Sequence, residues 1–128
     1  MRVRRYALVA LLGLIVGCGG AGKRASSVEG KDLTMDDLEA ITHDACKEIR
    51  SCDLIDDTDD ALAECMDRGL YTVDNGTQAC VKAYYLFEAC VAEAGCSDIE
   101  RLYKSSDKDV ECRSEGKNVE KKCNVNVF

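Results

Sequence analysis

The sequence contains no proline and no tryptophan, and it has a single histidine in 128 residues. Basic residues are also scarce, because 17 lysines and arginines stand against 24 aspartates and glutamates. A chain this acidic is poorly matched to nucleic acid or to anionic lipid headgroups, so we expect neither as a direct partner. After residue 18 no apolar run approaches the roughly 20 residues that a membrane-spanning helix needs.

The usual catalytic and metal-binding motifs are missing as well. No G-x-S-x-G motif occurs, and His43 lies off the apolar side of its predicted helix. Structural zinc sites usually bring ligands about two to four residues apart, whereas the closest cysteines here have five residues between them. We therefore predict a solvated His43, no catalytic residues, no metal and no cofactor. Carboxylates are plentiful, so composition alone leaves a paired-acid hydrolase open.

Residues 1–17 have the three-part pattern of a secretory signal peptide. Arginines at positions 2, 4 and 5 precede an apolar run from Tyr6 to Val16, and the small residue Gly17 precedes Cys18. The run is too short to span a bilayer. Cleavage after Gly17 leaves 111 residues with 14 basic and 24 acidic side chains, a formal charge of −10.

The end of this segment, Ile15-Val16-Gly17-Cys18, resembles the lipobox of bacterial lipoproteins. The resemblance implies processing by the lipoprotein-processing enzymes, a lipid such as palmitate on Cys18, and anchoring to a membrane through that lipid. In that family an aspartate after the cysteine often retains the protein at the inner membrane. Here Gly19 follows, which favours the outer membrane. The alternative is an ordinary signal peptide cut near residue 20, with Cys18 discarded.

Nine cysteines are an odd number for an exported protein. A lipid on Cys18 leaves an even set of eight, which is typical of four disulfides in a small exported domain. Along a helix, Cys46 and Cys52 would lie about 9 Å apart, and a disulfide needs Cα atoms within about 7 Å. Each cysteine must then bond to another segment. The eight are Cys46, Cys52, Cys65, Cys80, Cys90, Cys96, Cys112 and Cys123.

The spacing leaves the pairing of these cysteines open, but it favours two arrangements. A turn centred near residues 55–56 would bring Cys65 level with Cys46, so we predict that bond. The similar spacings of Cys80 and Cys90 and of Cys112 and Cys123 suggest two rungs of an antiparallel helical hairpin. This hairpin resembles twin Cys-x9-Cys proteins in geometry only, because the second spacing here is ten.

Hydrophobic periodicity predicts three main helices. The first follows a capping box at Thr34–Asp37 and runs to about residue 52. The second is capped near Thr58–Asp60 and runs to about Leu70. The third follows a capping-box-like sequence at residues 75–78 and stops at Gly95. Its stripe includes Tyr84 and Phe87, while Tyr71 and Tyr85 are expected to be exposed and suited to contacts.

The C-terminal third is expected to be less regular. A capping box at Ser97–Glu100 predicts a short helix with Ile99, Leu102 and Tyr103 turned inward. A weak helix is predicted between Cys112 and Cys123, followed by a short pairing strand or a frayed tail at 125–128. With a flexible tether at 18–31 and a cysteine-rich domain at 32–128, we predict an all-α, disulfide-stapled helical bundle.

Five aspartates between residues 53 and 60 form an acidic stretch before the second predicted helix. Read as a calcium-binding EF-hand loop, this stretch has Ile55 and Thr58 at positions that need a ligand and a glycine. The remaining alternatives are a solvated turn and a contact face for a basic partner, made of Asp56, Asp57, Asp59 and Asp60.

Together these patterns predict a membrane-anchored envelope lipoprotein with an interaction or structural role and an envelope protein as partner. The alternative is a very small envelope-acting enzyme or enzyme inhibitor. In plan, with a lipobox, a short tether and eight cysteines in a helical domain, the chain loosely resembles small cysteine-rich lipoproteins of unknown function from myxobacteria. That resemblance supplies no functional residues.

Overall fold

The computed structural model describes residues 28, 30–74 and 76–128. The predicted signal peptide, Cys18 and most of the tether lie outside the described residues. Over the described ranges the chain forms five helices and no strand: α2 (Met35–Ser51), α3 (Asp59–Tyr71), α4 (Gln78–Glu93), α5 (Cys96–Lys104) and α6 (Arg113–Cys123). None of these helices is long and apolar enough to cross a membrane. The predicted all-α, disulfide-stapled fold is confirmed.

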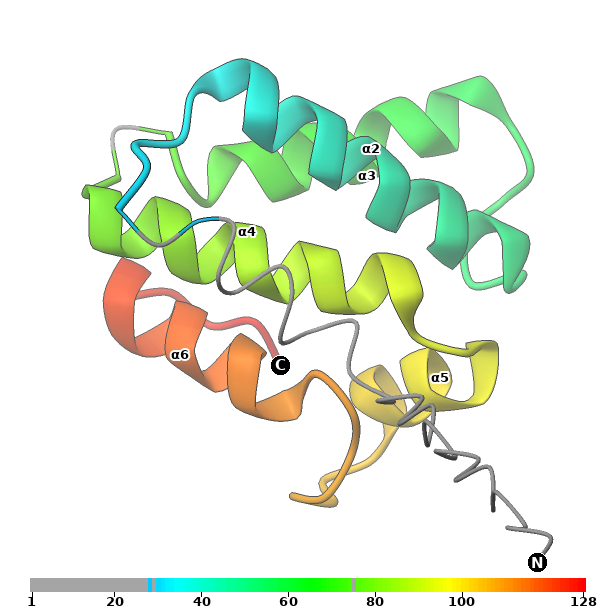
Figure 1. Cartoon of the computed structure of the whole chain (residues 1–128). Helices are drawn as coiled ribbons and strands as arrows, with labels where there is room; N and C mark the ends of the chain where they lie inside the picture. Colours follow the sequence, from blue (N-terminus) through cyan, green and yellow to red (C-terminus); the bar gives the residue numbers. More distant parts are fainter. Residues whose placement is uncertain (1–27, 29, 75) are drawn as a thin grey trace, which may run out of the picture.

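Helix α4 is the central element of the bundle. It packs against α2 on one side and α6 on the other, and α3 packs on α2 (Figure 1). The central position follows from composition, because α4 buries eight of its 16 residues and has no basic residue in its last turn. A helix that is apolar on most faces must be covered on more than one side. The largest fully buried side chains are Leu38, Thr42, Cys46, Val91, Ile99, Leu102 and Val119.

The first two helices begin where their caps predict. Thr34 accepts a hydrogen bond from the Asp37 amide, and the Asp37 carboxylate accepts one from the Thr34 amide at 2.9 Å, which completes the capping box. Thr58 caps α3 through the Ala61 amide at 3.1 Å. The two helices differ in packing, because α3 has no buried residue whereas α2 has five. The Cys46–Cys65 bridge therefore has a large share in holding α3 on α2.

Two predicted caps are wrong. Helix α4 is capped by Thr77, which accepts from the Cys80 amide at 3.2 Å, two residues later than the start of the 75–78 sequence. Helix α5 starts at Cys96 behind Gly95, with no side-chain cap, so Ser97 lies inside the first turn. The bond from Cys52 to Cys96 brings that cysteine to α2 and accounts for the earlier start.

The four disulfides join segments that lie far apart in the chain. Cys46 bonds to Cys65, as predicted. Cys80 bonds to Cys123 and Cys90 to Cys112, which are the two rungs of the antiparallel hairpin, here made by α4 and α6. Cys52 bonds to Cys96 and ties the end of α2 to the start of α5.

Both ends of the described chain pack more closely than expected. Val28 is 5% exposed and belongs to the core, so the packed region begins before the predicted boundary at residue 32. At the other end neither a strand nor a frayed tail forms. The Glu120 carboxylate accepts from the Val127 amide at 3.1 Å, and the Phe128 ring meets Phe87 edge-to-face with centroids 6.1 Å apart. This tail packs because Gly116 leaves room for the Phe128 ring.

Candidate functional site

All five helices and the C-terminal tail contribute to one cleft of about 440 Å³. Its volume is within the range of small-ligand sites. One wall is the Cys46–Cys65 bridge with Ile49 and Ile55, and Phe87, Val119 and Val127 supply further apolar surface. The polar groups come mainly from Thr42, Tyr84, Glu88 and Tyr103. The cleft is therefore amphipathic, with a few hydroxyls and one carboxyl among apolar walls.

A buried hydroxyl pair lines this cleft. Thr42 Oγ1 on α2 and Tyr84 Oη on α4 are 3.0 Å apart, and the Thr42 side chain is fully buried. Gly69 on α3 permits this arrangement, since a Cβ there would lie 2.9 Å from Thr42 Cγ2 and would collide with Tyr84 Oη. The pair thus joins α2 to α4 at a point where Gly69 lets α3 approach both helices closely.

Glu88 places a carboxyl among these groups. It is 9% exposed, and burial raises its pKa from 4.5 to about 8, while a hydrogen bond with Tyr84 partly offsets the shift. Burial also raises the pKa of Tyr84, and the nearby Glu88 carboxylate raises it further. The carboxyl is therefore largely neutral at pH 7. In that form it can donate one hydrogen bond as well as accept others.

The mouth of the cleft is less apolar than its interior. Arg68 lies at its edge with 78% of its side chain exposed, and it forms an ion pair with Glu64. Tyr103 is half-exposed, not inward as predicted, yet burial and the nearby Glu88 carboxylate both raise its pKa. Tyr103 therefore lines the cleft while part of its side chain meets solvent.

None of the four residues of the predicted acidic face lines the cleft, although Ile55 directly before them does. Asp56, Asp57, Asp59 and Asp60 are all exposed, around the turn between α2 and α3. Arg50 at the end of α2 faces two of them, with its Nε 3.6 Å from Asp57 Oδ1 and its Nη1 3.8 Å from Asp59 Oδ1. Part of the charge of this turn is therefore compensated within the domain. His43 is half-exposed beside Asp44, in agreement with a surface position.

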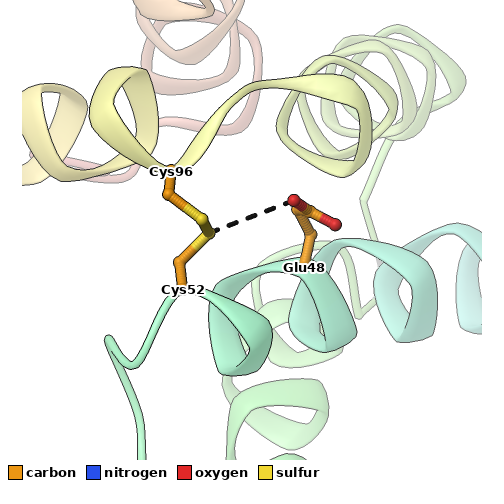
Figure 2. Close-up of side chains that lie close together, drawn as sticks. All are labelled: Glu48, Cys52 and Cys96. Carbon is orange, nitrogen blue, oxygen red and sulfur yellow. Dashed lines mark hydrogen bonds between the residues drawn. A yellow bond between two sulfur atoms is a disulfide. The ribbon is translucent and has the colours of Figure 1, made fainter.

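One group of side chains has the composition of a metal site. Glu48, Cys52 and Cys96 place a carboxylate oxygen and two sulfurs within 4.8 Å of one another (Figure 2). The two sulfurs are bonded to each other, however, and thiolates, not disulfides, are the metal ligands. The disulfide form offers only one good ligand, Glu48, so this group does not hold a metal while the bridge is closed.

Glu88 is the site residue that the sequence analysis missed. The signal was present, because Glu88 follows Tyr84 by four residues and precedes Val91 by three, which places it on the apolar stripe of α4. A lone carboxyl on a buried stripe is the kind of group whose pKa becomes perturbed, and such groups are enriched at functional sites.

Comparisons with known proteins add no relative. The chain matches no protein-family model, no curated protein and no solved structure.

Proposed function

We propose that this protein is a lipid-anchored envelope protein that captures a partner by contact, with the Glu88 cleft as the capture site. The cleft carries the proposal. It places the Glu88 carboxyl and the hydroxyls of Thr42, Tyr84 and Tyr103 among apolar walls, in a recess that an apolar side chain or a chain end of a partner could enter.

Anchoring through Cys18 is supported by the use of the other cysteines. The four bridges take up all eight cysteines between residues 46 and 123. Of the nine cysteines in the sequence, Cys18 is the one left for the lipid that the lipobox resemblance implies. The outer membrane is part of this proposal, because Gly19 follows the cysteine.

The cleft is a better candidate for the contact than the acidic turn. Charged groups exposed to solvent contribute little binding energy, and Arg50 already faces Asp57 and Asp59. Desolvated pockets with aromatic and polar groups carry most of the energy of protein contacts. Among the described residues that line the cleft, Glu88 is the one carboxyl, which suits recognition better than two-carboxyl hydrolysis.

The anchor is tested by replacing its sulfur. Cys18→Ser should abolish incorporation of labelled palmitate and leave an uncleaved or soluble form of the protein. The lipobox resemblance assigns the lipid to the Cys18 sulfur alone, and serine lacks that sulfur. Unchanged labelling in this variant would overturn the anchor.

The contact site is tested with a photo-crosslinking amino acid placed in intact cells at position 55 or at position 60. Ile55 lines the cleft, whereas Asp60 lies on the acidic turn. We expect a discrete crosslinked protein from position 55 and none from position 60, and loss of that crosslink in a Glu88→Leu background. Crosslinks from position 60 alone would move the contact to the acidic turn. Hydrolysis of peptidoglycan or peptide that Glu88→Gln abolishes would replace the contact role with an enzymatic one.

A further inference from the structure

The Cys52–Cys96 bridge differs from the other three in its accessibility. Cys96 is the only exposed cysteine of the eight that the structure describes, whereas Cys46, Cys80 and Cys112 are buried and the other four are intermediate. An incoming thiol must reach a disulfide sulfur along the line of the S–S bond, so access limits exchange. Among the described cysteines, Cys96 is therefore the residue most open to approach by a second protein.

The two sulfurs of this bridge also lie in opposite electrostatic surroundings. Cys96 is the first residue of α5, and no side chain caps that helix. Cys52 is the C-cap of α2, where the helix presents its negative end. Helix N-termini stabilise thiolates, and C-termini disfavour them. An opened bridge would therefore keep its negative charge on Cys96 and its proton on Cys52.

The Glu48 carboxylate lies close enough to Cys52 to take the proton of a Cys52 thiol. Glu48 Oε1 is 4.0 Å from Cys52 Sγ, a close contact in the disulfide and hydrogen-bonding range for a Cys52 thiol (Figure 2). Glu48 lies one helical turn before Cys52, so the shared helix holds the two groups together whether or not the bridge is closed.

We propose that Cys52–Cys96 is a thiol–disulfide exchange site whose substrate is a cysteine thiol of a second protein. The substrate thiolate attacks Cys96 Sγ, the Cys52–Cys96 bond breaks, and its electron pair goes to Cys52 Sγ, which takes a proton from water. A second thiol of the substrate protein then attacks the substrate sulfur that is bonded to Cys96, and the Cys96 thiolate leaves. Two substrate thiols are oxidised to a disulfide, and the bridge is reduced to two thiols.

In the reverse direction Cys96 is the nucleophile, and Cys52 releases the bound substrate after giving its proton to Glu48. The domain stays folded during either reaction, because Ile99 and Leu102 of α5 are 0% and 1% exposed and hold that helix on the core. Neither Cys52 nor Cys96 lines the cleft, so the exchange site is independent of where the contact site lies.

The test uses the intact mature protein in detergent, incubated in glutathione buffers of increasing reducing strength, then alkylated and analysed by mass spectrometry. We expect Cys52 and Cys96 to be alkylated before the other six cysteines, with unchanged far-ultraviolet circular dichroism, and glutathione to be trapped on Cys96 in Cys52→Ser. Opening of another bridge first, or opening of this one only together with unfolding, would overturn the proposal.

A second measurement isolates the proton transfer. Glu48→Gln should slow the release of glutathione from Cys96 by about a hundredfold near neutral pH, the lower end of general acid–base effects, and should flatten the pH dependence of that rate. Glu64→Gln is the matched control, because Glu64 is an exposed glutamate on α3 that pairs with Arg68. Equal rates for the two variants would remove Glu48 from the mechanism.

Discussion

Glu88→Gln is expected to stabilise the domain at neutral pH and to leave it nearly unchanged in acid. The pKa of Glu88 is raised from 4.5 to about 8 in the folded state, mainly by burial. At pH 7 the unfolded chain has this group ionised, so folding must protonate it. One pKa unit corresponds to about 1.4 kcal/mol. At pH 7 the free energy of unfolding of Glu88→Gln should therefore exceed that of the wild type by about 3 kcal/mol.

The sign of the pH dependence follows from the same shift. A carboxyl with a raised pKa binds its proton more tightly in the folded state, so wild-type stability falls as pH rises from about 4.5 to about 8. The difference between wild type and Glu88→Gln should therefore grow over that window and level off above it. Urea unfolding of both proteins at pH 4, 7 and 9 measures this difference. Glu39→Gln, an exposed glutamate on α2, is the control and should show no such trend. A Glu88→Gln protein no more stable than wild type at pH 9 would contradict the buried-carboxyl account.

Removal of the Cys80–Cys123 bridge should destabilise the domain more than removal of Cys46–Cys65 or Cys90–Cys112, which close shorter loops. The bond closes a loop with a sequence separation of 43 residues. On the chain-entropy account, opening such a loop in the unfolded chain costs about 4 kcal/mol. We expect the Cys80→Ala/Cys123→Ala protein to lose that amount in urea unfolding. Cys80 is also 2% exposed, so its truncation leaves a small cavity.

A matched pair separates loop length from helix attachment. Cys90–Cys112 joins the same two helices across a separation of only 22 residues. Its removal should cost about 3.4 kcal/mol on the same account. Hydrogen exchange supplies a second readout. The Val127 amide donates a hydrogen bond to the Glu120 carboxylate, and release of Cys123 should expose that amide to exchange. A loss below about 1 kcal/mol with unchanged protection of Val127 would show that packing, not the bridge, fixes the tail.

Local signals predicted much of this fold because several helices carry strong ones. Thr34 and Thr58 cap the helices that follow them, and the stripe containing Tyr84 and Phe87 is buried as its period indicates. Helix α6 was weakly signalled because Val119 is almost its only apolar residue. The two bridges to α4 position that helix, and its N-cap, Cys112, adopts a left-handed φ of 64°, which its residue type does not favour.

The site was harder to predict than the helices because it depends on contacts between distant segments. Thr42 and Tyr84 are 42 residues apart, and their hydrogen bond requires the close approach of a third helix at Gly69. No local pattern brings Val127 of the tail to the same cleft. The partner of Cys96 was likewise open, since its bond to Cys52 spans 44 residues.

The disulfide pattern has a consequence for how the chain must mature. None of the four bonds joins two cysteines that are consecutive in the sequence. Cys52 lies between the partners of Cys46–Cys65, and Cys96 lies between those of Cys90–Cys112. Three cysteines lie between the partners of each of the two longer bonds. A chain that enters an oxidising compartment with its N-terminus first presents its cysteines one after another. Neighbours that meet early would form bonds that the folded protein does not contain. For an exported chain, such early bonds would have to be reshuffled before the native set forms. Uncatalysed rearrangement takes minutes to hours, so we expect the yield of native protein to depend on disulfide isomerase activity.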